Sequence, residues 1–354
     1  MKNHLIPLVN IDHNSHVIKK WHRFVKFGER PTGVNEKVIH SWERSKELKV
    51  DAYGGRSSVI LTSEELEKKL EQYKPLINIT LPYINNIVQT IKGLGYIVFL
   101  TDGDTNILYV SGDKDVLEDF KHIFNFKVGA AWSEKAVGTT AVSMVISNNN
   151  AVPFMADEKY CYELKKRACS AVPIRNMDGD IIAILGIAAG FATPNAQLSG
   201  ILLAAEMAIE NQLRMMKMNE KFRLVNEYYK TIFNSVSDAI IAVDHNGMIT
   251  ELNQNALEIL REDSDKLIGK KAEAVLGFYP VILDVLKTGR EFSQNYVLKD
   301  TKDKKMLYKV KRIIPIFNDN NRVDGCIKKK KKIETKKMKT RKGFLFENII
   351  GRSE

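Results

Sequence analysis

The stretch YIVFLTDGDTNILYV at residues 96–110 predicts a β-hairpin, because two β-rich runs flank an Asp-Gly-Asp turn. Glycine supplies the positive φ that such a turn requires. The same design recurs in SAVPIRNMDGDIIAILGI at residues 170–187, which turns at another Asp-Gly pair. Helical patterns separate the two hairpins, at residues 114–126, 133–147 and 157–167. This alternation predicts an antiparallel sheet with helices packed on it, an α+β module.

A second stretch, DAIIAVDHNGMITEL at residues 238–252, repeats the strand-turn-strand pattern around a His-Asn-Gly turn. Short helices and further strand-like runs follow it: helices near residues 254–261 and 268–287, and strands at residues 291–298, 305–316 and 324–327. Strands interrupted by small helices indicate a second antiparallel sheet with a helical cover.

Residues 196–235 predict one long connecting helix, since no turn signal interrupts them and apolar residues recur every three or four positions. Two interpretations of this helix stay open. It packs on its own domain, or it forms a parallel dimer seam, although Gln212, Asn219 and Asn226 interrupt a strict heptad. The predicted fold class is therefore α+β, with two antiparallel-sheet domains joined by a long helix.

The positive charge of the chain is concentrated in one place. The 354-residue sequence has a formal net charge of +11, and nine of these charges lie in residues 328–342. Like charges repel one another and offer no apolar face, so we expect a flexible basic linker there. The alternative is weak phosphate contact with nucleic acid, without sequence preference. The candidates for that contact are Lys328, Lys329, Lys330, Lys331 and Lys332.

The sequence argues against several classes of site. Three cysteines without C-x-x-C spacing disfavour a disulfide framework or a zinc site and fit a reducing cytosol. The longest apolar stretch, residues 181–192, is shorter than the ~20 residues that span a bilayer. No G-x-x-x-x-G-K followed by Ser or Thr occurs, so the phosphate cradle of a P-loop ATPase is missing. We expect a cytoplasmic protein that is not an enzyme and has no membrane partner, metal site, haem or flavin.

The segment GAAWSEKAVGTTA at residues 129–141 resembles the loop and helix start of GAF-type domains in acetoin-operon-type activators. ACSAVPI at residues 168–174 and SWERS at residues 41–45 are similar to other segments of the same proteins. The resemblance implies a site for a small apolar or weakly polar effector. Its candidate residues are Trp132, Thr139, Thr140, Tyr160, Cys169 and Ser170, with Thr140 in place of the family's commoner asparagine. The alternative is that Trp132 is only a core anchor.

The second module is similar to a PAS domain, in residues 238–244, 247–249, 253–256, 267–270 and 285–289. In PAS folds the position of Asn253 usually caps or braces a helix, which implies a mainly structural role for this residue. No haem or flavin anchor is evident in the module, so no cofactor is expected.

The final residues, GFLFENIIGRSE at 343–354, resemble the first line of the AAA+ ATPase domain in sigma-54-dependent transcriptional activators. The resemblance implies the sensory half of such a regulator, which binds a small-molecule effector and forms a homodimer. RNA polymerase with sigma-54, and DNA, would be partners only of a full-length family member. Two alternatives are a stand-alone ligand-binding regulator that acts by dimerisation and a nucleic-acid binder that uses the lysine run.

The predicted domains follow one another along the chain. They are an N-terminal helical or irregular region (1–61), a GAF-like sensor domain (62–215), a connector helix (196–235), a PAS domain (226–327), a basic linker (328–343) and the first residues of an ATPase domain (344–354).

Overall fold

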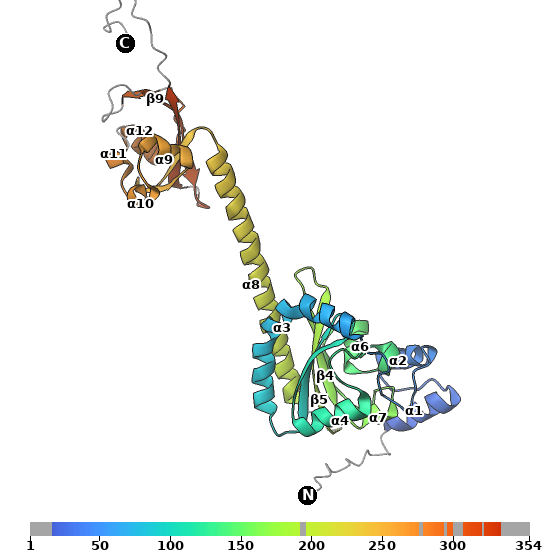
Figure 1. Cartoon of the computed structure of the whole chain (residues 1–354). Coiled ribbons are helices and arrows are strands. Elements are labelled where there is room, and N and C mark those ends of the chain that lie inside the picture. The colour runs from blue at the N-terminus through green and yellow to red at the C-terminus, as the bar shows by residue number, and fades with distance from the viewer. Residues whose placement is uncertain are drawn as a thin grey trace, which may run out of the picture. The chain divides into compact units, whose positions relative to one another are not determined.

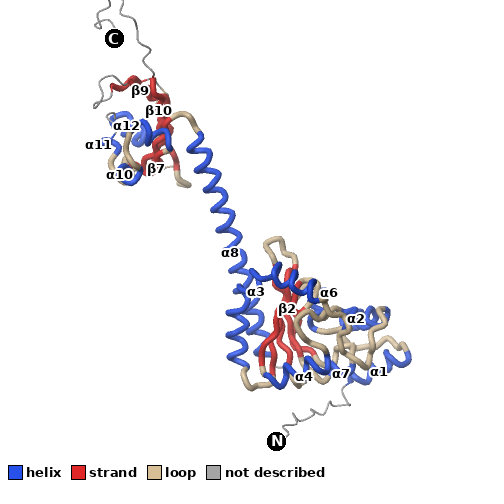
Figure 2. Tube along the Cα trace, in the orientation of Figure 1, coloured by secondary structure: helices blue, strands red, loops and turns tan. Residues whose placement is uncertain are grey.

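The computed structural model describes residues 16–191, 196–275, 279–293, 296–299, 307–320 and 322–333. The chain divides into two compact units, Met1–Glu220 and Lys221–Glu354. Each unit contains an antiparallel five-stranded sheet, and helix α8 (Ala196–Ser235) contributes residues to both units (Figures 1 and 2). The predicted α+β class with two sheets and a long helix is confirmed. The domain bounds drawn from the sequence stay predictions.

The first unit is built on a sheet with the strand order β2-β1-β5-β4-β3. Its strands are β1 (Tyr96–Asp102), β2 (Ile107–Gly112), β3 (Val152–Met155), β4 (Cys169–Arg175) and β5 (Ile181–Ala189). The two predicted hairpins are the pairs β1–β2 and β4–β5, and the long-range pairing of β1 with β5 joins them into one sheet. The sequence could indicate the hairpins because each closes locally, whereas the β1–β5 pairing links distant segments.

Helices cover both faces of this sheet. On one face lie α3 (Ser63–Ile91) and the first part of α8, which pack on alternate β1 residues such as Val98 and Leu100. On the other face, Ile97 and Phe99 contact a core that includes side chains of the remaining helices of the unit (Figure 1). These helices are α1 (His16–Phe27), α2 (Glu36–Glu47), α4 (Lys114–Phe124), α5 (Glu134–Val137), α6 (Ala141–Asn148) and α7 (Tyr162–Lys165).

Two helix predictions in this unit were too long. The helix expected at residues 133–147 is divided into α5 and α6 by Gly138, whose φ of +68° is unfavourable for a residue with a side chain. The helix expected at residues 157–167 shrinks to the four residues of α7. Backbone carbonyls of Asp157 and Leu164 accept hydrogen bonds from lysine side chains there. Such competition for backbone groups favours a compact loop over a regular helix.

The second unit has the strand order β7-β6-β10-β9-β8. Its strands are β6 (Ala239–Asp244), β7 (Ile249–Leu252), β8 (Tyr296–Lys299), β9 (Leu307–Phe317) and β10 (Val323–Ile333). Its short helices are α9 (Gln254–Leu260), α10 (Ser264–Leu267), α11 (Ala272–Val275) and α12 (Tyr279–Thr288). Buried residues of α12 and the sheet, Ile282, Val285, Ile241 and Ile313, share one apolar core.

The first part of the lysine run forms a strand, where the sequence analysis predicted a flexible linker. Strand β10 continues to Ile333 and lies in the middle of the sheet, where residue 328 pairs with Ile241 of β6 and Ile313 of β9. The expected flexible linker is therefore wrong for residues 328–333. A central strand finds backbone partners on both sides, which offsets the repulsion that charge patterning considers alone. Residues 334–354, which include the rest of the predicted linker and the predicted start of the ATPase domain, lie outside the described residues.

Strand β10 also includes the lysines that were predicted to contact phosphate, and it buries one of them. Lys328 is 2% exposed, so its side chain is not available to a nucleic-acid backbone in this fold. Prediction from charge alone failed at this position because side chains alternate between the two faces of a strand, and one of those faces is covered.

Candidate ligand-binding site

A small cavity lies on the side of the first sheet that is opposite α3 and α8. It encloses about 20 Å³, roughly the room that one water molecule needs. Its lining combines aromatic, aliphatic and basic side chains: Phe99, Phe120, Phe126, Trp132, Thr140, Val142, Lys159, Leu164, Arg167, Cys169 and Ala188. A ligand larger than water must therefore move some of these side chains apart.

Aromatic rings form one wall of the cavity. The ring of Phe126 meets Trp132 edge to face, with centroids 4.6 Å apart, and also contacts Phe99 and Phe120 at 5.2 and 5.6 Å. The Phe99 ring lies over Gly186, where an added Cβ would be 2.2 Å from a ring atom. Glycine at that position therefore leaves the space that the Phe99 ring occupies.

Basic side chains form the polar part of the lining. Lys159 is 3% exposed, and its ammonium donates hydrogen bonds to the carbonyls of Leu164 (3.2 Å) and Arg167. Burial lowers the pKa of Lys159 and also that of Arg167. The Arg167 guanidinium is 3.9 Å from Asp119, while its buried Nε has no hydrogen-bond partner among the described residues. Two cations thus border an otherwise largely apolar cavity.

Three of the six predicted effector residues line this cavity: Trp132, Thr140 and Cys169. The hydroxyl of Thr140 also has a structural role, since it accepts a hydrogen bond from the Ser143 amide (3.3 Å) at the start of α6. This is an N-cap, which satisfies one of the free amides at a helix start.

The other three predicted residues do not line it. The hydroxyls of Thr139 and Ser41 share a hydrogen bond of 2.8 Å. Tyr160 is buried, and burial raises the pKa of its phenol to about 12. Ser170 follows Cys169 on β4 and so points to the opposite face of the sheet, where its hydroxyl lies 3.3 Å from that of Ser199 on α8. A motif match does not distinguish the two sides of a strand.

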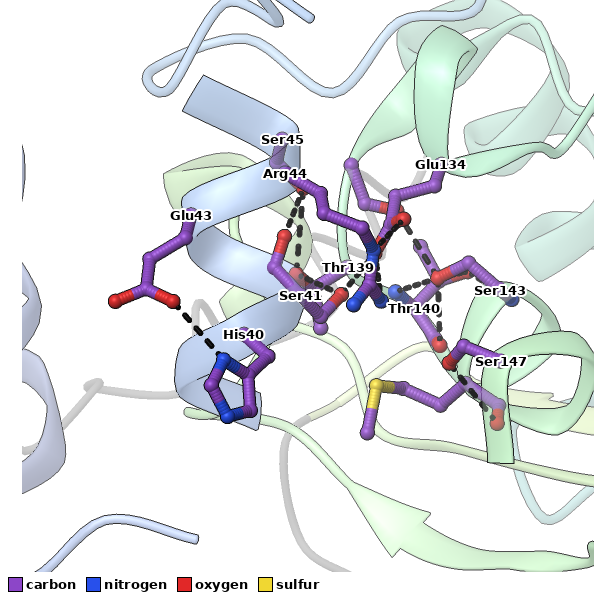
Figure 3. Close-up of polar contacts among 12 residues, drawn as sticks. His40, Ser41, Glu43, Arg44, Ser45, Glu134, Thr139, Thr140, Ser143 and Ser147 are labelled. Atoms are coloured by element: carbon purple, nitrogen blue, oxygen red, sulfur yellow. Dashed lines mark hydrogen bonds and ion pairs between the residues drawn. The ribbon is translucent and has the colours of Figure 1, made fainter. Parts of the chain in front are cut away.

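A polar network ties α2 to the segment that leads into the cavity (Figure 3). The carboxylate of Glu134 accepts hydrogen bonds from Arg44 at 2.7 and 3.0 Å and another from the Ser41 hydroxyl. Ser41 in turn meets Thr139, which directly precedes the cavity residue Thr140. Two of the three segments that carried the resemblance to GAF-type domains, at 41–45 and 129–141, are thus in direct contact.

The sequence did not indicate a buried lysine beside two tryptophans. The ammonium of Lys165 lies 4.8 Å from the ring centroid of Trp21 and 5.1 Å from that of Trp42. It donates hydrogen bonds to the carbonyls of Asp157 (2.5 Å) and Lys159. Burial lowers the pKa of Lys165 to about 7. No spacing rule in the sequence foretold this, because α1, α2 and α7 come together only in the fold.

In the second unit, Asn253 is fully buried, and its side chain forms hydrogen bonds with five backbone groups, the longest of them to the carbonyl of Val236 at 3.5 Å. Its side-chain oxygen accepts hydrogen bonds from the amides of Ile240 (2.8 Å) and Ala256 (2.9 Å). Its amide nitrogen donates to the carbonyls of Asp238 (2.9 Å) and Phe233 (3.1 Å). Asn253 therefore caps α9 and connects the C-terminal turn of α8 to the first strand of the unit.

Within the described ranges, no three His, Cys, Asp or Glu side chains are grouped so that they could hold a metal ion. In the same part of the chain, no helix combines the length and apolar character needed to cross a bilayer.

Comparison with known proteins gives a family model for the second unit and relatives for the chain. Residues 227–327 match the family model of the PAS fold. A signal-transduction and transcriptional-control protein of Clostridium beijerinckii is 26% identical over 84% of this chain. The acetoin dehydrogenase operon transcriptional activator AcoR of Bacillus subtilis is 27% identical over 62% of this chain. The chain is related to acetoin-type transcriptional activators. The predicted resemblance to the sensory part of such an activator is confirmed.

A solved structure supports the fold of the sensory part. The crystal structure of the Escherichia coli DhaR(N)–DhaL complex matches 83% of this chain and 99% of its own chain, with a TM-score of 0.73 and 18% identity. The chain spans 47% and 36% of the lengths of the two curated relatives named above.

Proposed function

We propose that this chain is the signal-sensing region of a cytoplasmic, sigma-54-dependent transcriptional regulator, and that a small-molecule effector binds in the cavity beside Trp132. The cavity is the observation that carries the proposal, since a mostly apolar pocket with a few polar groups is the usual form of a small-molecule site. The two relatives, a transcriptional-control protein and a transcriptional activator, support the regulatory role. The ATPase and DNA-binding output is proposed from the resemblance of residues 343–354 alone.

A route from the cavity to the long helix runs through consecutive residues of one strand. Cys169 lines the cavity, and the next residue, Ser170, contacts Ser199 of α8 on the other side of the sheet. A ligand that shifts β4 therefore also shifts a contact of α8. We propose that α8 carries this displacement toward the PAS domain, where Asn253 binds the last turn of the helix.

This proposal assigns the chain a binding role and no catalytic role. The named relatives are regulators, which agrees with a protein that senses and does not turn over a substrate. A stand-alone regulator with the same cavity would bind the effector identically and differ only in its output. The nucleic-acid alternative loses one of its candidates, because Lys328 is buried.

Effector binding is expected to depend on Trp132. In a thermal-shift screen of the full chain against small acids, amides, ketones and alcohols, at least one compound should raise the midpoint. Trp132→Ala removes a large aromatic contact, so the affinity for that compound should fall by about ten- to hundredfold. Trp132→Phe keeps part of the contact and should lose less.

The matched control is Ser170→Ala, on the opposite face of β4, which should keep the affinity nearly unchanged. Because Trp132→Ala also leaves a cavity, circular dichroism must show that the variant is folded. Equal binding by folded Trp132→Ala and by the unchanged protein would place the effector elsewhere.

We infer that the homodimer forms through α8. Six residues follow the alternating four- and three-residue spacing of a coiled-coil seam, and each is at least 43% exposed. They are Met215, Met218, Phe222, Val225, Tyr229 and Ile232. A second copy of the same helix in parallel orientation presents the same stripe and can cover it.

Val225→Glu is expected to convert the dimer to a 40.2 kDa monomer in sedimentation experiments, because it places like charges opposite each other in the seam. The control is Leu224→Glu, which adds the same charge one position away and outside the stripe, at a residue that is 44% exposed. If both variants sediment alike, α8 is not the dimer interface.

A further inference from the structure

We propose that the effector of the first unit is a small organic anion, a monocarboxylate, whose charged group lies between Lys159 and Arg167 and whose apolar part contacts the aromatic wall. This inference rests on the proposed function and adds the chemical class of the ligand. It differs from the expectation drawn from the family resemblance, which implied an apolar or weakly polar molecule.

The first argument concerns the hydrogen bonds of Lys159 and its lack of a counter-ion among the described residues. Its ammonium has three N–H donors, and the carbonyls of Leu164 and Arg167 accept two of them. A further neighbour of the ammonium is the thiol of Cys169, a weak acceptor that also lines the cavity. No described carboxylate forms an ion pair with Lys159, and a buried charge without a counter-ion is costly. A carboxylate in the cavity would supply the missing counter-ion.

The second argument is the unused donor of Arg167. The side chain is 19% exposed, and its one ion pair among the described residues, to Asp119, is long at 3.9 Å. Its Nε is also buried and has no hydrogen-bond partner among the described residues. A guanidinium offers neighbouring N–H groups that match the two oxygens of a carboxylate. Arg167 can therefore satisfy its orphaned donor by binding the same group as Lys159.

The third argument is the remainder of the lining. Among the described residues, no Asp or Glu lines the cavity, so none of these lining side chains repels a negative group. The aromatic wall and Val142, Leu164 and Ala188 favour an apolar body. The volume of about 20 Å³ requires that the body be small or that the rings move. A neutral ligand of the same shape would leave Lys159 without a counter-ion, which favours a short-chain monocarboxylate.

The test compares acids with amides of the same shape, isobutyrate with isobutyramide and benzoate with benzamide, by calorimetric titration of the full chain. Because a hydrogen bond to a charged group contributes about 1.5–3 kcal/mol, each acid should bind about ten- to hundredfold more tightly than its amide. Lys159→Met should reduce this preference for the acid to nearly none. Arg167→Gln should reduce it by about tenfold and serves if Lys159→Met does not fold.

Lys166→Gln is the matched control, since Lys166 neighbours the site in sequence but pairs with Glu163 at 2.6 Å and does not line the cavity. It should keep the full preference. If amides bind as tightly as acids, and this binding depends on Trp132, the proposal of an anionic ligand is wrong and the proposed sensor function stands. Acid binding that both cation variants leave unchanged, or no acid binding at millimolar concentration, would also overturn the proposed anionic ligand.

Discussion

Asn253→Ala is expected to lower the free energy of unfolding of the PAS unit by about 3 kcal/mol or more. The substitution removes five hydrogen bonds at a residue with no exposed surface, and each buried group left without a partner costs about 1–3 kcal/mol. It also removes the cap of α9 and the link to the carbonyl of Phe233 on α8. The substitution should therefore lower the stability of the unit and weaken its connection to the long helix.

Hydrogen exchange at the amides of Ile240 and Ala256 measures this effect within the PAS unit itself. The matched control is Asn255→Ala, two positions away, where one side-chain bond to the carbonyl of Val236 (2.7 Å) is lost. That change should cost about 1 kcal/mol. Similar losses of protection in the two variants would show that the five bonds of Asn253 do not act together.

The first unit should become more stable by about 2 kcal/mol between pH 7 and pH 9, and Lys165→Met should remove most of this rise. Burial lowers the folded-state pKa of Lys165 from 10.5 to about 7. In this window the unfolded chain therefore binds a proton that the folded chain has released, so stability increases with pH. Below pH 7 both states are protonated and the contribution is constant.

Other groups titrate below and above this pH range. Burial raises the pKa of Glu206 to about 7 from 4.5, so its effect falls below pH 7. The pKa of the Cys161 thiol rises from 9 to about 12, so its opposite effect appears above pH 9. Burial also lowers the pKa of Lys159, which acts on stability in the same direction as the shift of Lys165.

Urea unfolding followed by tryptophan fluorescence reports on the first unit, because Trp21, Trp42 and Trp132 are the chain's three tryptophans. The control is Lys166→Met, which removes a half-buried lysine paired with Glu163 and should retain the full rise. If Lys165→Met and Lys166→Met show the same dependence on pH, Lys165 is not the titrating group.

Local signals in the sequence foretold the local parts of the fold. The Asp-Gly turns located the β1–β2 and β4–β5 hairpins, whose paired strands are joined by a short turn. The lysine run was misinterpreted because charge patterning says nothing about β6 and β9, whose backbones pair with it. Those partners come from distant segments, and only the assembled sheet brings them together.

The residues of the candidate site also differ in how far the sequence indicated them. The family resemblance pointed to Trp132 and Cys169, which do line the cavity, and also to Thr139 and Ser170, which do not. It did not point to the cations, because the predicted helix at residues 157–167 would have placed their side chains around a helix surface. Their position follows from the irregular backbone that the lysines themselves stabilise.

The most direct test of the account is a fluorine NMR titration of the full chain labelled with 5-fluorotryptophan. The chain has three tryptophans, and Trp132→Phe identifies the resonance of Trp132. Titration with the effector, or with the acids and amides above, should shift the Trp132 resonance in a saturable manner and leave those of Trp21 and Trp42 nearly unchanged. A saturating ligand that leaves the Trp132 resonance unmoved would contradict effector binding in this cavity.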